Sequence, residues 1–153
     1  MKEYIHGGDI HRHPDVLDYS ANINPLGTPP GVIRAAKDSM ERVCHYPDAC
    51  QEKLKQALAE YEQVPVEWLI CGNGAAELIF ALVQAVKPKR ALVLAPTFAE
   101  YAQALEAVGC EVNREILKKE DGFTLQDRIL DRLKKEDLQM VFLCNPNNPT
   151  GIL

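Results

Sequence analysis

The spacing of the apolar residues changes near Trp68 and divides the chain into two parts. Residues 1–15 are polar and follow neither the helical nor the strand period, which is typical of an arm, and a turn-rich run to Gly31 follows them. In residues 32–43 and 51–63 the apolar positions repeat every three or four residues. The first part is therefore predicted to consist of an arm and two helices.

After Trp68, short apolar runs alternate with helical segments. The apolar runs, each predicted to be a strand, are residues 68–71, 90–95, 110–117 and 140–144. The helices are predicted at about 75–86 and within 97–109 and 124–135. Strands joined through helices need crossover connections, which give parallel pairing and helices on both faces of the sheet. The sequence therefore predicts an α/β fold, a three-layer α/β/α arrangement with a mostly parallel sheet.

Composition and charge narrow the functions that the chain supports. Of its 153 residues 46% are hydrophobic, enough for a core, and the formal net charge of -5 comes from interspersed acidic and basic residues. This pattern favours neither a nucleic-acid surface nor a basic membrane-binding face. The chain shows no basic start followed by an apolar run and no stretch of about 18 apolar residues. The cytoplasm is the expected compartment.

The five cysteines are scattered along the chain, and no two of them show Cys-x-x-Cys spacing. None shares a ligand-like cluster with a histidine. This distribution favours reduced thiols over a disulfide framework or a metal site.

The strand-to-helix turns are the candidate sites, because ligands of open α/β sheets bind at the carboxyl ends of the strands. The turn "CGNGAAE" places Gly72 and Gly74 where the backbone turns tightly, and the N–H groups that begin the next helix can hold an anion. The turn lacks the Gly-Lys-Ser/Thr of a Walker loop and the third small residue of a dinucleotide loop. By itself it is equally compatible with ordinary turn chemistry.

Two further turns carry side chains suited to a flat, polar ligand. "APTFAEY" puts Phe98 just past a strand, where its ring can stack on an aromatic ligand or pack at the start of a helix. "NPNNPTG", residues 145–151, presents several amides on a backbone stiffened by two prolines. Asn-Pro is common in simple turns, but a run of this length after a buried strand favours a functional site.

These three motifs together resemble the fold-type I pyridoxal-phosphate (PLP) enzymes, in the branch of the histidinol-phosphate aminotransferases and threonine-phosphate decarboxylases. "NPNNPTG" is similar to the signature of that branch, "GNGAAELI" to its cofactor-phosphate loop and "PTFAEY" to its ring-stacking segment. The segments "HGGDI" and "LDYSANINPLG" are similar to the decarboxylases of cobalamin biosynthesis. The resemblance covers nearly the whole chain and implies PLP-dependent decarboxylation of threonine phosphate to aminopropanol phosphate.

For the cofactor, the resemblance implies specific contacts. Main-chain N–H groups near Gly74, Ala75 and Ala76 would hold the PLP phosphate. Phe98 would stack on the pyridine ring, and Asn148 would donate its side-chain amide to the phenolic oxygen of the ring. Relatives often carry a polar side chain where this chain has two alanines, so only backbone donors are expected there.

Three more residues are assigned by resemblance. Tyr46 is similar to a tyrosine that reaches the cofactor phosphate of the neighbouring subunit, which implies a homodimer. His6 and Asn22 are similar to residues that line the phosphate and carboxylate region of the substrate. Both also have simpler interpretations, since a histidine in an arm is often solvated and an asparagine in a turn often caps backbone groups.

The resemblance places the remaining machinery downstream of the asparagine motif: a Schiff-base lysine, an acidic partner of the pyridine nitrogen and a carboxylate-binding arginine. We therefore expect the chain to be the N-terminal part of a longer enzyme and to be inactive alone. Residues 1–50 would form the arm and part of the small domain, and residues 51–153 the first half of the large PLP-binding domain. Two alternatives stay open: a histidinol-phosphate-type aminotransferase and a non-enzymatic phosphate-binding α/β module.

Overall fold

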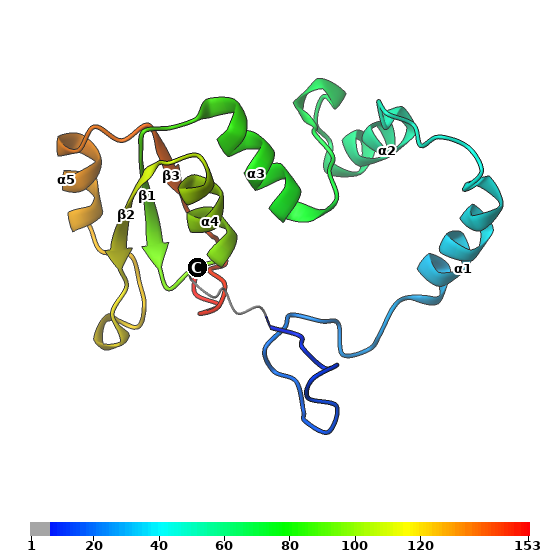
Figure 1. Ribbon diagram of the computed structural model, residues 1–153, viewed down its shortest axis with the longest axis horizontal. Helices are drawn as coiled ribbons and strands as arrows, with labels where there is room; N and C mark the ends of the chain where they lie inside the picture. Colours follow the sequence, from blue (N-terminus) through cyan, green and yellow to red (C-terminus); the bar gives the residue numbers. More distant parts are fainter. Residues whose placement is uncertain (1–6) are drawn as a thin grey trace. The chain divides into compact units, whose positions relative to one another are not determined.

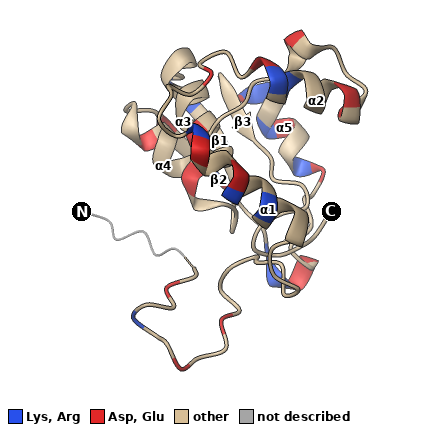
Figure 2. Cartoon of the chain, turned by 90° about the vertical axis from the view of Figure 1, so that its right-hand side faces the viewer, with Lys and Arg blue, Asp and Glu red and all other residues tan. Residues whose placement is uncertain are grey.

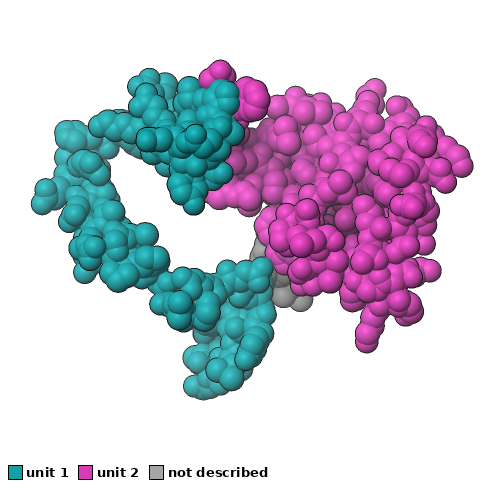
Figure 3. Space-filling model, turned by 180° about the vertical axis from the view of Figure 1, so that it is seen from behind, with its two compact units in different colours: residues 1–66 teal, residues 67–153 magenta. Residues whose placement is uncertain are grey.

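The computed structural model describes residues 7–153, so His6 lies outside the described part of the chain. The chain divides into two compact units, one up to Val66 and one from Glu67 to Leu153 (Figure 3). The predicted domain boundary after residue 50 stays a prediction, because it concerns the domains of a longer protein.

The first unit contains the two predicted helices. Helix α1 covers Pro30–Ser39 and continues into a 3-10 turn, η1, at Met40–Arg42; helix α2 covers Glu52–Glu62. Proline at the first position of α1 suits its fixed backbone angle. No residue between 7 and 66 is buried, so the apolar sides of both helices remain exposed in the structure.

The second unit is an α/β structure around a three-stranded parallel sheet (Figure 1). Strand β1, Arg90–Ala95, is central and pairs with β2, Glu111–Ile116, on one side and with β3, Met140–Phe142, on the other. The helices are α3, Gly74–Val86, α4, Ala99–Ala107, and α5, Arg128–Lys135. Short 3-10 turns lie at Val66–Trp68 (η2) and Lys119–Asp121 (η3). The predicted fold class is confirmed.

The strand predicted at residues 68–71 is wrong. The chain forms η2 there and then an irregular segment, and Trp68 and Ile70 are each 74% exposed. An extended segment becomes a strand only when its backbone groups pair with a neighbour. In the described residues β2 and β3 occupy both sides of β1, and this segment pairs with none of the three strands.

Helices cover both faces of the sheet, as predicted. On one face Ala91 and Val93 form a buried cluster with Val83 of α3 and with Ala104 and Leu105 of α4. The neighbouring β1 residues, Leu92 and Leu94, are also buried and point to the opposite face because side chains alternate along a strand. Glu115 is the partner of Leu94 in the register and is bound by arginines of α5, which places α5 over that second face.

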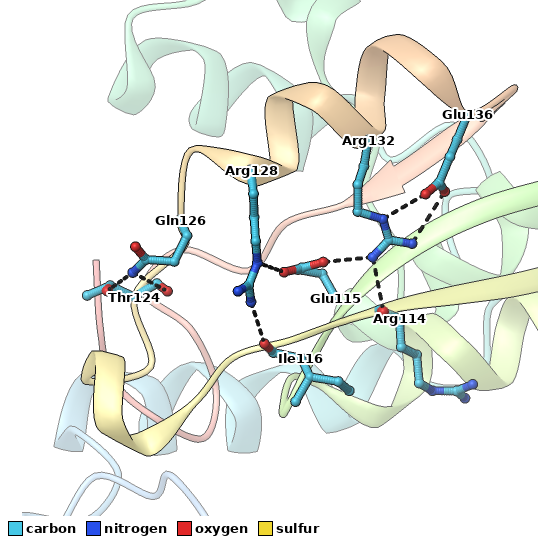
Figure 4. A network of polar contacts seen from close by, with 8 residues as sticks. All are labelled: Arg114, Glu115, Ile116, Thr124, Gln126, Arg128, Arg132 and Glu136. Carbon is cyan, nitrogen blue, oxygen red and sulfur yellow. Dashed lines mark hydrogen bonds and ion pairs between the residues drawn. The ribbon is translucent and has the colours of Figure 1, made fainter.

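A buried carboxylate joins α5 to the sheet (Figure 4). Glu115, only 7% exposed, accepts hydrogen bonds from Arg128 Nε at 2.8 Å and from Arg132 Nη1 at 2.7 Å. Arg132 also pairs at 2.7 Å with Glu136, the C-cap of α5. Burial, the largest single effect, acts to raise the pKa of Glu115, but the hydrogen bonds from both arginines and their charges outweigh it and lower this pKa.

We expect Glu115→Gln to lower the free energy of unfolding at neutral pH by about 1–3 kcal/mol, because it removes the negative charge of a buried group and replaces one of its two acceptor oxygens by an NH2 group that cannot accept from an arginine. The folded-state pKa of Glu115 is lowered, so its contribution is complete above its unfolded pKa and is lost as the pH falls through the folded pKa. Urea unfolding at a series of pH values tests this. Glu111→Gln on the same strand is the control, since Glu111 is exposed and its 3.4 Å pair with Arg90 is worth less than about 1 kcal/mol. Equal losses for both variants would contradict the assignment.

Candidate functional site

Two polar turns meet at the carboxyl edge of the sheet. The first, residues 96–98, follows β1, and the second, residues 143–151, follows β3, which pairs directly with β1. Both contain cis Xaa-Pro bonds, at Pro96 and at Pro146 and Pro149. The strand order therefore brings together two of the three motifs that the sequence singles out.

Asn147 ties these two turns to each other. Its Nδ2 group donates to the carbonyl oxygen of Pro96 at 3.0 Å and to Oγ1 of Thr150 at 2.9 Å. Its Oδ1 atom accepts a hydrogen bond from the Thr97 hydroxyl at 2.8 Å. Asn147 is only 5% exposed, so this polar side chain is buried with its hydrogen bonds made inside the protein.

Asn148, the predicted donor to a ring oxygen, follows immediately on the same turn and is half-buried. Its main-chain N–H donates to the sulfur of Cys144 at 3.4 Å. The Cys144 thiol in turn donates to the carbonyl oxygen of Pro146 at 3.4 Å. The backbone that carries Asn148 is therefore held from within its own turn.

Phe98, the predicted stacking residue, is the N-cap of α4 and is half-buried. Its ring meets Tyr101 edge to face, with centroids 5.6 Å apart and an interplanar angle of 77°. Tyr101 stacks on Phe142 of β3, with centroids 4.6 Å apart and an angle of 13°. Phe98 thus packs against the start of its helix, and its role towards a ligand stays a prediction.

Tyr101 connects the aromatic group with the asparagine turn. The pKa of Tyr101 is raised to about 12. Burial is the largest cause, and a hydrogen bond with Cys144 and the charges of Cys144 and Glu100 act in the same direction. The phenol is therefore neutral at physiological pH and serves as a hydrogen-bonding group rather than as a charge. Tyr101 thus lies near Cys144, whose sulfur accepts a hydrogen bond from the N–H of Asn148.

The third motif forms the N-terminus of α3. Gly74 has a φ of +83°, a left-handed conformation that favours glycine, and its N–H donates to the carbonyl oxygen of Gly72 at 2.9 Å. The N–H groups of the first helical turn, which include those of Ala75 and Ala76, have no acceptor within the helix. Glu77 accepts a hydrogen bond from the N–H of Asn73. This end of α3 suits an anion, and small side chains leave its backbone approachable.

The other predicted site residues belong to the first unit or precede the described part. Tyr46 is fully exposed in the loop between η1 and α2, and Asn22 is exposed in the turn-rich run before α1. Close to Asn22, Asp18 accepts hydrogen bonds from the N–H and hydroxyl of Ser20, which lower its pKa. The roles of Tyr46, Asn22 and His6 stay predictions.

A cavity of about 230 Å³ lies beside the asparagine turn, on the face of the sheet that carries Leu94. Its walls are largely apolar and include Leu94, Leu117, Phe123, Leu125, Leu143 and Ile152. Among the described residues that line it, none has a carboxylate, imidazole or ammonium side chain. The side chains of this cavity therefore supply a mainly apolar surface rather than acid–base groups.

Sequence reasoning missed four residues of this edge: Thr97, Tyr101, Cys144 and the buried position of Asn147. Tyr101 could have been found, because it follows Phe98 by three positions on a helix and so shares its side. The asparagines of one turn cannot be told apart by sequence, since the turn geometry decides which of them points inwards. The spatial pairing of β1 with β3 supplies that information.

The described residues offer neither a metal-binding cluster nor a membrane-spanning helix. Between residues 7 and 153, His, Cys, Asp and Glu form no group of three or more that could hold a metal ion. In the same range, no helix has the length and apolarity needed to cross a membrane. Acidic and basic residues are mixed on α2 and on α5 (Figure 2).

The chain is similar in sequence and in structure to known proteins. The family described as "Aminotransferase class I and II" matches residues 14–153. A threonine-phosphate decarboxylase of Salmonella typhimurium is 48% identical over 97% of this chain, and a histidinol-phosphate aminotransferase of Desulfitobacterium hafniense is 38% identical over 92%. The chain spans 43% and 41% of the length of these two relatives. The histidinol-phosphate aminotransferase structure from Clostridium acetobutylicum aligns with 88% of this chain and 39% of its own at a TM-score of 0.72 and 28% identity.

Proposed function

Because the chain belongs to the aminotransferase class I and II family, we propose that it is the N-terminal part of a PLP-dependent enzyme that removes carbon dioxide from threonine phosphate. The product would be aminopropanol phosphate for cobalamin biosynthesis. The observation that carries the choice of reaction is the 48% identity to the Salmonella decarboxylase over nearly the whole chain. The decarboxylase-like segments "HGGDI" and "LDYSANINPLG" support the same choice.

The residues of the second unit fit such a cofactor. A dianionic phosphate suits the N-terminus of α3, where main-chain N–H groups near Gly74, Ala75 and Ala76 and the helix dipole would hold it, although the Gly74 N–H itself donates to Gly72 in this structure. Phe98 and Asn148 stand on turns that follow two paired strands, as a ring held between a stacking face and an amide donor requires. The aromatic packing of Phe98 on Tyr101 would keep its ring in place for that contact.

The chain's own residues would bind and orient rather than exchange protons. PLP, when bound, supplies an electron sink that allows a bond to the substrate's α-carbon to break. Asn148 would donate a hydrogen bond to the phenolic oxygen of the ring and so set its charge. His6 and Asn22 would line the region of the substrate's phosphate and carboxylate, and the orientation of the substrate there decides which bond lies perpendicular to the ring. Tyr46 would reach the cofactor phosphate of a second subunit in a homodimer.

One alternative is supported by a specific observation. The Desulfitobacterium relative and the Clostridium structure are both described as histidinol-phosphate aminotransferases. Such an enzyme would use the same cofactor residues but would hold the substrate so that a proton, and not the carboxylate, leaves the α-carbon. The two reactions therefore differ in the orientation of the bound substrate.

The proposal is tested with the full-length protein that contains this chain, incubated with PLP and threonine phosphate. We expect carbon dioxide to be released in the absence of any keto-acid acceptor, with no transfer of the amino group. Transamination of histidinol phosphate without release of carbon dioxide would establish the alternative instead. Absence of the visible absorbance of bound PLP would overturn both.

A further inference from the structure

We propose that Asn147 is a positioning residue that fixes the turn of Phe98 against the turn of Asn148. In so far as those two residues hold PLP, the proposal rests on the function proposed above. Asn147 itself touches neither a ligand nor a reacting group in this assignment. It acts through the backbone of two neighbouring strand ends.

The hydrogen bonds of Asn147 leave one orientation for its amide. The Pro96 carbonyl oxygen can only accept, so the atom 3.0 Å from it must be Nδ2. Oδ1 then faces the Thr97 hydroxyl, which donates to it at 2.8 Å. One side chain thus satisfies both an acceptor and a donor of the Phe98 turn, 51 and 50 residues earlier in the chain.

The same residue also closes its own turn. Its Nδ2 donates to Thr150 Oγ1 at 2.9 Å, its main-chain N–H donates to the Ile152 carbonyl at 2.8 Å, and its carbonyl accepts from Gly151 N–H at 2.6 Å. With an exposure of 5%, it has little water to replace these partners. Loss of the amide would remove the partner of partly buried polar groups on both turns, which is unfavourable wherever water does not replace it.

These bonds determine how the proposed cofactor contacts are spaced. Asn148 is the next residue after Asn147, and Phe98 is the next residue after Thr97. The Thr97–Asn147 hydrogen bond therefore sets the separation of the two backbones that carry the stacking ring and the amide donor. A binding constellation tolerates displacements of only about 0.5 Å, so loosening this link should weaken binding without removing either contact residue.

The experiment uses the full-length protein and two pairs of matched variants. Asn147→Ala removes the tie, whereas Asn145→Ala removes an exposed asparagine of the same turn. Thr97→Val deletes a single hydroxyl at nearly constant shape, whereas Thr97→Ser keeps the hydroxyl. Three properties are measured well below the unfolding temperature: the Kd for PLP, the pH midpoint of the absorbance change of bound PLP, and backbone hydrogen exchange of the protein without PLP.

We expect Asn147→Ala to raise the Kd for PLP about tenfold or more and Asn145→Ala to change it less than about twofold. The absorbance midpoint should rise by about half a pH unit or more when the Asn148 amide no longer stabilises the deprotonated phenolic oxygen. Without PLP, Thr97→Val should speed hydrogen exchange in the peptide that contains residues 147–151. Thr97→Ser should leave this exchange at the wild-type rate. This last effect crosses from one turn to the other and needs no cofactor.

The outcomes separate the two proposals. If the parent protein fails to bind PLP, the proposed function fails, and the exchange data alone decide whether Asn147 couples the turns. Unchanged exchange at residues 147–151 in Thr97→Val would overturn the tie. If Asn147→Ala does not fold, the Thr97 pair gives the same readouts. A loss of thermal stability in Thr97→Val with wild-type Kd, midpoint and exchange would show a merely structural role and also reject the proposal.

Discussion

Replacing Ala75 with aspartate is expected to weaken PLP binding by the full-length protein about a hundredfold. Ala75 is exposed in the first turn of α3, where its N–H lacks a partner within the helix. A carboxylate at this position would repel the phosphate of the cofactor and compete for the same backbone donors. The Kd is measured by absorbance titration at low ionic strength, where screening is weakest.

The same substitution should leave the fold intact, which separates binding from stability. An acidic residue near a helix N-terminus interacts favourably with the helix dipole, typically by about 0.3–1 kcal/mol. Gln84→Glu is the control for charge, because it adds one negative charge in the C-terminal half of the same helix. Ala75→Ser should act in the opposite direction by offering a hydroxyl to the phosphate. Wild-type affinity in Ala75→Asp would place the phosphate elsewhere and remove Gly74, Ala75 and Ala76 from the site.

The regular elements of the second unit could be predicted because the apolar pattern within each segment is enough to identify it. Strand β1 is buried along four of its six residues and is flanked by turn signals, so a short apolar run identifies it. The strand predicted at residues 68–71 has a similar pattern but no partner among the described strands. The local pattern indicates a tendency to be extended, whereas strand formation depends on a pairing neighbour, which is often far away in sequence.

Single residues of the site were predictable only where a motif names them. Phe98 and Asn148 were assigned through resemblance, and the structure places both on turns at the same sheet edge. Asn147 was not distinguished from its neighbours, because its burial results from contacts with Pro96 and Thr97. Long-range hydrogen bonds of this kind leave no periodic signal in the sequence.

Two kinds of interaction hold the elements at the carboxyl edge of the sheet together. Aromatic stacking between Tyr101 and Phe142 joins α4 to β3, and the bonds of Asn147 join the turns above them. The first is apolar and tolerant of small shifts, while the second has directional requirements. A site that must hold a flat ring needs both, since packing alone does not fix orientation.

The largest effect on stability is expected for Leu105→Ala. Leu105 of α4 is fully buried in the cluster formed with Val83, Val93 and Ala104. Removing its side chain should lower the free energy of unfolding by about 3–5 kcal/mol, because the lost burial is accompanied by a cavity that the packed sheet cannot close. This is a large share of the stability of an ordinary domain, about 5–15 kcal/mol.

Native-state hydrogen exchange of the β1 amides in the full-length protein measures this change where it arises. Leu130→Ala on α5 is the matched control, because the same atoms are removed from a side chain that is 51% exposed. It should cost less than about 1.5 kcal/mol, since only part of the leucine is transferred back to water and no closed cavity forms. Because α4 also carries Phe98 at its N-cap, Leu105→Ala should loosen PLP binding through the displaced helix, whereas Leu130→Ala should leave the Kd unchanged. Similar exchange rates for the two variants would show that α4 does not pack on β1 as described.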